Sequence, residues 1–327
     1  MRLFVCEFIT GGGLQDEELP ARLAREGDMM LTALLRDLQD AGTDELLTTR
    51  DPRLHVPSGK IKTIVPGNDV WDTWRKCMKE SDAAWLIAPE TDGVLYKLTL
   101  IAQEQGCKII GCSPEAVKLA GSKSRTIECL SSFNIPCVPI WMDVAHIQDT
   151  QGGWVIKPDD GVGAEGCFYF KNIKSLRNYV NDLNSNARYI VQEFIAGIPA
   201  SVSFLCYQGE ALLLSCNQQL FEFADSKGHF KGVIVNGLRQ YAYEFETIAK
   251  SIAGAVRGLA GYIGIDLIVT DSGPVVVEIN PRLTTAYAGL RQSLGQNPAK
   301  WILSLCQTGR FPELQGVNYV PVTIKLE

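Results

Sequence analysis

An aspartate, a glutamate and an asparagine within residues 264–280 have a spacing that could bring three oxygen ligands together. This run reads as two strands joined by a turn at 271–274. Because side chains alternate along a strand, Glu278 and Asn280 point to the same face. A hairpin that folds back at the turn can bring Asp266 onto that face as well. The neighbouring Val and Ile residues indicate that this surface is buried.

Buried carboxylates are unfavourable unless their charge is compensated, and a hard divalent cation carrying nucleotide phosphates would compensate it. Arg282 continues the alternation and would add an anion-binding group beside the metal. The competing interpretation is an ordinary hairpin with solvated acids on its outer face. We expect the first arrangement, and with it an enzyme that uses ATP and one or two Mg²⁺ ions, with Mn²⁺ as a substitute.

A second pattern that suits phosphate chemistry lies near the middle of the chain. A predicted strand ends in Lys157 and runs into the loop 159–166, which contains Gly161, Gly163 and Gly166. Glycines let backbone N–H groups approach phosphates and let a loop move as a lid, and the lysine would add a compact positive charge. In a Walker P-loop the lysine follows the glycines, whereas here it precedes them. The match to a dinucleotide fingerprint leads into strand residues and not into a helix, so it is not expected to bind NAD.

Two further segments are weak signals when each is taken alone. Lys123 opens a predicted helix, where a nearby anion would be favourable, although a surface lysine is the simpler interpretation. Residues 192–197 end a strand and enter a loop. A strand edge that leaves its sheet exposes a C=O and an N–H group, which can pair with the edge of an adenine.

The elements that must position these residues change in character along the chain. Residues 1–112 alternate strands and helices, which predicts a parallel sheet covered by helices on both faces. The strands are expected at 3–8, 46–48, 61–65, 83–88 and 108–111, and the helices at 19–38, 70–79 and 93–105. Beyond residue 112 we expect helices and short strands, then longer strands with the hairpin. The predicted domains are residues 1–112, 113–195 and 196–327.

Composition restricts the class of protein. Of the 327 residues, 46% are hydrophobic and 21% are charged, as in an ordinary globular protein, and the net charge of −6 argues against a nucleic-acid partner. No apolar run approaches the roughly 20 residues that span a membrane. The ten cysteines form no C-x-x-C pair and do not cluster with the three histidines, so we expect no zinc site and a reducing, cytoplasmic location.

Taken in order, these elements resemble the ATP-grasp superfamily over essentially the whole chain. The resemblance implies an α/β domain with a parallel sheet, followed by two α+β subdomains that clasp ATP. It implies a metal site at Asp266, Glu278 and Asn280, and catalytic roles for Arg282 and Lys157. Many members carry an acid after the hinge glycine to bind the ribose, and Ser201 is the substitute available here. The residues implied for ATP binding are Lys123, Lys157, Gly161, Gly163, Gly166, Gln192, Glu193, Ile195 and Ser201.

A narrower resemblance rests on other motifs. The segments 7–13, 89–93, 200–203 and 214–219 are similar to the branch that contains the tyramine–L-glutamate ligases of methanofuran-type cofactor biosynthesis. This implies that the γ-carboxylate of glutamate is activated as an acyl phosphate and that tyramine supplies the amine. The α-carboxylate of glutamate would then need a cation. The candidates by position are Lys231, Arg239 and Arg291.

Several interpretations compete with this one. The nearest is an ATP-grasp ligase for a different acid and amine, such as an amino acid ligase. A non-catalytic nucleotide-binding protein is disfavoured because the lysines, the metal ligands and the arginine are all present. A dehydrogenase built on residues 1–112 would leave the Asp, Glu and Asn set unexplained. Partners are expected to be small molecules, with a homodimer as the oligomeric state considered.

Overall fold

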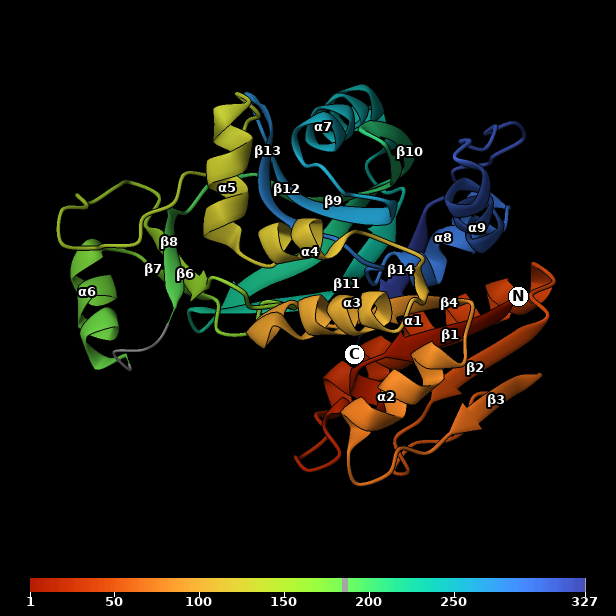
Figure 1. Cartoon of the computed structure of the whole chain (residues 1–327). Coiled ribbons are helices and arrows are strands. Elements are labelled where there is room, and N and C mark those ends of the chain that lie inside the picture. Colours follow the sequence, from red (N-terminus) through yellow and green to blue (C-terminus); the bar gives the residue numbers. More distant parts are fainter. Residues whose placement is uncertain (184–187, 327) are drawn as a thin grey trace.

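The computed structural model describes residues 1–183 and 188–326 and begins with a parallel sheet (Figure 1). The strand order is β3-β2-β1-β4-β5, and every pair is parallel. This confirms the parallel sheet that the βαβ rhythm predicts. The strands are β1 (Arg2–Glu7), β2 (Glu45–Thr49), β3 (Ile61–Ile64), β4 (Ala83–Ile87) and β5 (Lys108–Ile109).

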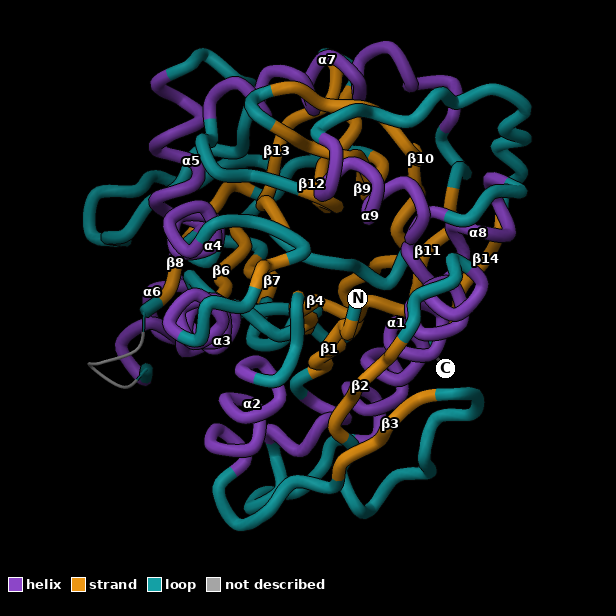
Figure 2. The backbone as a smooth tube through the Cα atoms, turned by 45° about the vertical axis from the view of Figure 1, so that its right-hand side comes forward, coloured by secondary structure: helices purple, strands orange, loops and turns teal. Residues whose placement is uncertain are grey.

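Helices cover both faces of this first sheet (Figure 2). Alternate residues of β1 explain the arrangement, since Leu3 and Val5 pack with α1 (Ala21–Asp40), while Phe4 and Cys6 pack on the opposite side. On that side lie α2 (Val70–Lys79) and α3 (Val94–Glu104). Helix α2 begins where the Asp69 carboxylate accepts hydrogen bonds from two backbone N–H groups.

A second, mostly antiparallel sheet forms the rest of the core. Its order is β13-β12-β9-β10-β11-β7-β6-β8, with β14 paired to β11. Figure 1 shows β6, β7 and β8 set apart from the long strands, to which β7 is joined through β11. The strands are β6 (Trp154–Pro158), β7 (Phe168–Phe170), β8 (Tyr189–Glu193), β9 (Ile198–Tyr207), β10 (Glu210–Ala224), β11 (Lys227–Val235), β12 (Gly261–Thr270), β13 (Gly273–Asn280) and β14 (Val322–Lys325).

The remaining helices lie around the second sheet. Ser113 caps α4, and Pro114 is its first residue, a position where proline suits a helix. The helices are α4 (Pro114–Ala120), α5 (Lys123–Ser132), α6 (Ile173–Asp182), α7 (Ala242–Ala255), α8 (Tyr287–Leu294) and α9 (Pro298–Thr308), with short helical turns at η1 (Ile9–Gly13), η2 (Thr91–Gly93) and η3 (Arg239–Tyr241). Helix α8 is not expected from the sequence, because it is short and Gly289 interrupts it. Burial of its Tyr287 and Leu290 against α1 stabilises it.

The two sheets are joined by shared apolar packing. Leu31 and Leu34 of α1 belong to one cluster of buried residues together with Tyr287 of α8 and Ile302 of α9. This packing places the carboxyl ends of β1 and β4 beside the loop that follows β13. In the described ranges, 1–183 and 188–326, no helix combines the length and the apolar character needed to cross a membrane.

Candidate active site

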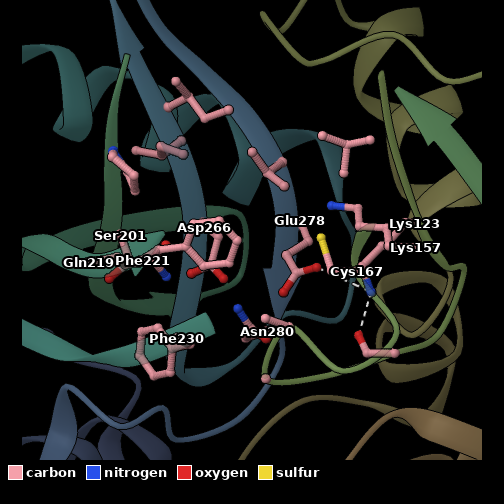
Figure 3. Close-up of a pocket in the computed structure, with 18 of the residues that line it drawn as sticks. Lys123, Lys157, Cys167, Ser201, Gln219, Phe221, Phe230, Asp266, Glu278 and Asn280 are labelled. Carbon is pink, nitrogen blue, oxygen red and sulfur yellow. Dashed lines mark hydrogen bonds and ion pairs between the residues drawn. The ribbon is translucent and has the colours of Figure 1, made fainter. Parts of the chain in front are cut away.

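The two predicted acidic ligands lie directly opposite each other on neighbouring strands. Asp266 of β12 pairs with Glu278 of β13, and the register shifts immediately after this pair, so that Val277 is an extra residue on β13. Such a bulge bends the strand and redirects its side chains. Figure 3 shows the side chains of Asp266, Glu278 and Asn280 facing one cavity. The hairpin and the common face that the alternation predicts are therefore present.

Two lysines lie beside these acids. Lys123 Nζ is 3.1 Å from Glu278 Oε2 and donates a hydrogen bond of 2.5 Å to the carbonyl oxygen of Gly161. Burial opposes ionisation of Glu278, but the charges of Lys123 and Lys157 outweigh it and hold the pKa of Glu278 below its usual value. Burial and the neighbouring Glu278 raise the pKa of Asp266 to about 8. Two carboxylates in contact in a buried place are a strained arrangement that a cation would relieve.

The donor set fits a magnesium ion that is bound together with a nucleotide. Mg²⁺ binds oxygen ligands, usually one or two carboxylates completed by substrate phosphates and water. In the part of the chain that the structure describes, no group of three or more His, Cys, Asp or Glu side chains could hold a metal ion. Asp266, Glu278 and the amide of Asn280 therefore match a site that the nucleotide itself completes.

Lys157 lies at the end of β6, where the glycine-rich loop begins. Burial and the nearby Lys123 lower the pKa of Lys157, while Glu278 opposes this effect. The loop is tied at its start, because the Asp159 carboxylate accepts hydrogen bonds from Ser122 Oγ (2.7 Å) and the Ser124 N–H (2.7 Å). Figure 3 shows that Lys123 and Lys157 point into the same part of the cavity as Glu278.

The loop 159–166 borders the cavity as the glycine pattern predicts. Gly161 and Gly163 line it, whereas Gly166 packs under Pro158, where a Cβ at that position would lie 2.9 Å from Pro158 Cγ. The loop also contacts the segment that follows β4 of the first sheet, because Thr91 Oγ1 donates a 3.0 Å hydrogen bond to the carbonyl oxygen of Asp160. The close packing against Pro158 therefore requires a glycine at position 166, which is not among the residues that line the cavity.

The cavity, which has a volume of about 440 Å³, also has many apolar lining residues. Gln192 ends β8 and is buried, and its Nε2 donates a 3.2 Å hydrogen bond to the Val138 carbonyl oxygen. Glu193 and Ile195 follow at the strand end and line the cavity. Apolar side chains beside the end of a strand suit a purine base. The apolar lining residues here are Val138, Val155, Phe194, Ile195, Leu267, Ile268 and Val277.

Arg282 lies at the cavity, but its guanidinium is already engaged. Its Nε and Nη2 donate to the two carboxylate oxygens of Glu90 at 3.0 and 2.9 Å. Glu90 is buried and follows β4 of the first sheet. Sequence reasoning includes Glu90 only within the segment 89–93 and does not give it a role. The signal that could have identified it is a carboxylate at the carboxyl end of a parallel strand, where ligands commonly bind.

The predicted substrate cations lie in different places. Arg291 pairs with Asp37 (3.0 Å) and Asp40 (2.5 Å) on α1, outside the cavity lining. Arg239 is also outside it and stacks over the ring of Tyr319, 3.9 Å from the ring centre. The structure brings neither arginine to the cavity. Both side chains have partners elsewhere, Arg291 on α1 and Arg239 at Tyr319.

Lys231 and Ser201 lie closer to the predicted machinery. Lys231 Nζ is 2.5 Å from Glu222 Oε1, and Glu222 lines the cavity. Ser201 of β9 pairs across the sheet with Asp266 and accepts a hydrogen bond from Asn217 Nδ2 (3.3 Å). Ser201 lines the cavity beside Asp266 (Figure 3), and its contact with the ribose stays a prediction.

Comparisons with known proteins agree with this geometry. The family model of the ATP-grasp domain matches residues 120–286, and the model of the pre ATP-grasp 3 domain matches residues 45–117. The tyramine–L-glutamate ligase of Methanocaldococcus jannaschii is 27% identical over 293 residues, which cover 87% of this chain and 83% of the relative. The corresponding ligase of Methanocaldococcus fervens is 29% identical, covering 87% and 88%.

Solved structures share the fold. A crystal structure of a protein assigned to the ATP-grasp superfamily, from Archaeoglobus fulgidus, has a TM-score of 0.74 and 23% identity, and each chain is covered completely. A crystal structure of the L-amino acid ligase of Bacillus licheniformis has a TM-score of 0.68 and 15% identity, covering 94% of this chain and 74% of that one. At these identities the likeness concerns the fold alone.

Proposed function

The chain belongs to the ATP-grasp family and is an ATP-dependent ligase that joins carbon to nitrogen, and we propose that it joins the γ-carboxylate of L-glutamate to tyramine. The observation that supports the chemistry is the pairing of Asp266 with Glu278, with Lys123 bridging from Glu278 to the glycine-rich loop. The choice of substrates is supported by the two relatives, whose names are tyramine–L-glutamate ligase and whose likeness extends over 87% of this chain.

The proposed reaction has two steps. A carboxylate oxygen of glutamate attacks the γ-phosphorus of ATP, the bond from that phosphorus to the bridging oxygen breaks, and ADP leaves. The ammonium of the second substrate loses one proton to become the free amine, whose nitrogen attacks the carbonyl carbon of the acyl phosphate. The C–O bond to phosphate breaks, the nitrogen loses a second proton, and the amide, which keeps one N–H, and inorganic phosphate are released. The first step is needed because a free carboxylate is a poor electrophile with a poor leaving group.

The residues around the cavity have separate tasks in this scheme. Lys123 and Lys157 neutralise the phosphate oxygens of ATP as compact charges. Arg282, held by Glu90, stabilises the transferring phosphoryl group and then the oxyanion that forms when the amine attacks. Asp266, Glu278 and Asn280 would hold Mg²⁺. When bound, the ion supplies charge neutralisation for the β- and γ-phosphates.

The glycine-rich loop would exclude water, which otherwise hydrolyses an acyl phosphate. Lys123 supports this task, because one ammonium contacts both the carbonyl oxygen of Gly161 in the loop and the carboxylate of Glu278. The apolar side chains beside the end of β8 receive the adenine, with the backbone of Glu193 and Ile195 at its edge.

The test is ADP release by the purified protein in ATP and Mg²⁺, with glutamate alone, with tyramine alone and with both. We expect release to require both substrates and the product to have the mass of γ-glutamyltyramine. Release with another acid and amine from a panel, and not with this pair, would overturn the assigned substrates but keep the ligase. A product in which the α-carboxylate is joined would overturn the assigned regiochemistry.

A further inference from the structure

One wall of the cavity carries a carboxylate that the proposed mechanism does not use. Glu26 of α1 lines the cavity together with Thr284 and Thr285, which follow Arg282 in the chain. The hydroxyl of Thr285 donates a hydrogen bond to Glu26 Oε1. Thr285 is buried, so its hydroxyl fixes the orientation of the carboxylate at the junction of the two sheets.

The lining offers the carboxylate of Glu26 little positive charge. In the described part of the lining the cations are Lys123, Lys157 and Arg282. Both lysines lie beside Glu278, and Arg282 is paired with Glu90, so no lining cation is directed at Glu26 alone. Arg282 is shared between Glu90, which is not a lining residue, and Glu26. Arg22, one helical turn before Glu26 on α1, donates a hydrogen bond to the Phe230 carbonyl oxygen, so the charge of Glu26 is only partly compensated. An incoming cation would balance that charge, whereas an anion would be repelled.

Apolar side chains of β11 lie close to this part of α1. Phe230 and Val233 line the cavity, and the hydrogen bond from Arg22 to the Phe230 carbonyl oxygen joins β11 to α1 one turn before Glu26. Figure 3 shows the ring of Phe230 directed into the cavity, below Asp266. A ligand that meets this wall therefore needs an apolar body, and one that reaches Glu26 needs a positive end. A primary ammonium on an aromatic or long alkyl group has both properties.

The position of Glu26 follows from the motif at residues 7–13. The buried Glu7 carboxylate accepts hydrogen bonds from the Ile9 N–H, the Thr10 N–H and the Thr10 hydroxyl at the end of β1. Helix α1 approaches it closely at Gly27, where a Cβ would lie 2.7 Å from the Glu7 carboxylate. Because Gly27 follows Glu26 directly, this close packing sets the depth at which Glu26 enters the cavity.

We propose that Glu26, oriented by Thr285, is the subsite that receives the ammonium of the amine substrate, beside an apolar wall that includes Phe230. This assignment rests on the proposed function and deepens it, since it names the residue that selects an amine as the second substrate. The carboxylate accepts charge-assisted hydrogen bonds from the ammonium and holds its nitrogen near Arg282, where the acyl phosphate forms.

The test compares Glu26→Gln with Glu18→Gln, a matched change at an exposed glutamate. Hydroxylamine, which is largely uncharged at neutral pH, traps an acyl phosphate as a hydroxamate and reports the first step without the amine. For Glu26→Gln we expect the KM for tyramine to rise about tenfold or more, from the lost charge-assisted hydrogen bond. The KM for glutamate and the rate of hydroxamate formation should change less than about twofold. In Glu18→Gln both KM values and the rate of hydroxamate formation should also change less than about twofold.

Two results of this comparison would overturn the assignment. An unchanged KM for tyramine would mean that Glu26 only links α1 to the loop through Thr285. A rise in the KM for glutamate, or a parallel fall in hydroxamate formation, would place Glu26 in the binding of the acid or in the packing of the site.

A binding measurement separates this assignment from the ligase reaction itself. Calorimetry with a non-hydrolysable ATP analogue and Mg²⁺ compares tyramine with 4-(2-hydroxyethyl)phenol, which has a hydroxyl in place of the ammonium. We expect the wild type to prefer tyramine by about tenfold and Glu26→Gln to lose that preference. If no hydroxamate forms with glutamate, the proposed substrates fail while this preference still tests the subsite. Absence of tyramine binding, or equal binding of the two phenols, would overturn the subsite.

Discussion

The guanidinium of Arg282 is held at two points by the carboxylate of Glu90, which lies 192 residues earlier in the chain. The contact joins the carboxyl end of β4 in the first sheet to the loop after β13 in the second. Both side chains are largely buried, at 12% and 6% exposure for Arg282 and Glu90. A planar two-point pair fixes both the position and the plane of the guanidinium. The first sheet thereby orients an arginine of the second.

Glu90→Gln is expected to lower kcat by about tenfold to a hundredfold, because misplacement of a catalytic group by about 1 Å can cost about a hundredfold. The amide keeps the shape of the carboxylate but loses its charge and one of its two acceptor oxygens. Steady-state kinetics with ATP and both substrates measure the change. The affinity for ATP, followed by calorimetry, should change less than about threefold, since the lysines bind the phosphates.

Glu104→Gln is the control for this prediction, because it makes the same change at an exposed residue near the end of α3. A folded Glu90→Gln protein with wild-type kcat would show that Arg282 does not need its partner in order to act. A loss of ATP affinity as large as the loss of kcat would instead indicate that the pair supports the whole cavity.

Glu278→Ala is expected to reduce turnover by more than about tenfold, because it removes a metal ligand and the partner of Lys123. The protein should remain folded, since Lys123 keeps its hydrogen bond to the carbonyl oxygen of Gly161. Steady-state kinetics measure the turnover, and thermal unfolding shows whether the variant is folded. Mg²⁺ with ATP should raise the unfolding temperature of the wild type but raise that of the variant much less.

An exposed acid provides the control for Glu278. Asp271 lies in the turn of the same hairpin. In Asp271→Ala, Mg²⁺ with ATP should raise the unfolding temperature as much as in the wild type. More than a tenth of wild-type turnover in folded Glu278→Ala protein, a threshold of about 1.4 kcal/mol in transition-state stabilisation, would contradict the metal assignment.

Lys157→Ala is expected to weaken ATP binding by about tenfold or more, the effect of losing a charge-assisted hydrogen bond to phosphate. Folding should be affected less than binding. Burial and the nearby Lys123 lower the pKa of Lys157, so its charge is unfavourable when no nucleotide is present. Calorimetry gives the affinity and thermal unfolding gives the stability. Lys171→Ala, at an exposed lysine, is the matched control, and an unchanged ATP affinity in Lys157→Ala would count against the assigned role.

Local pattern is sufficient to predict much of this protein. The alternation within 264–280 predicts the hairpin and the common face of Glu278 and Asn280, because the period of a strand is a property of neighbouring residues. The rhythm of strands and helices in residues 1–112 predicts the parallel sheet for the same reason. Short helices such as α8 escape this kind of prediction, since tertiary packing and not local pattern stabilises them.

Contacts between distant segments are not predictable in this way. Nothing in the neighbourhood of Glu90 or Glu26 shows that either will meet the loop after β13. Position in the chain suggests Arg239 and Arg291 as substrate cations, yet each has a partner outside the cavity. A charged residue satisfies its charge with whichever group the fold brings close, and that choice depends on how the two sheets dock.

The buried Glu7 provides a test by pH of the junction beneath α1. Burial raises the pKa of Glu7 above its ordinary value of 4.5, although hydrogen bonds from Thr10 and Ile9 oppose the effect. The folded protein therefore holds this proton more tightly than the unfolded chain does. Between the two pKa values the folded state binds more protons, so the contribution of Glu7 to stability falls as pH rises.

Glu7→Gln removes this titration and keeps the size of the side chain. The difference in unfolding free energy between wild type and variant should therefore be most favourable to the wild type below about pH 4.5 and decline above it. The decline amounts to about 1.4 kcal/mol for each unit by which the folded pKa exceeds 4.5. Denaturant titrations of both proteins from pH 4 upward measure it. Other acids titrate equally in the two proteins, so their contributions cancel in the difference. A difference in unfolding free energy that is constant or rises with pH would show that Glu7 is already ionised in the folded protein at acid pH.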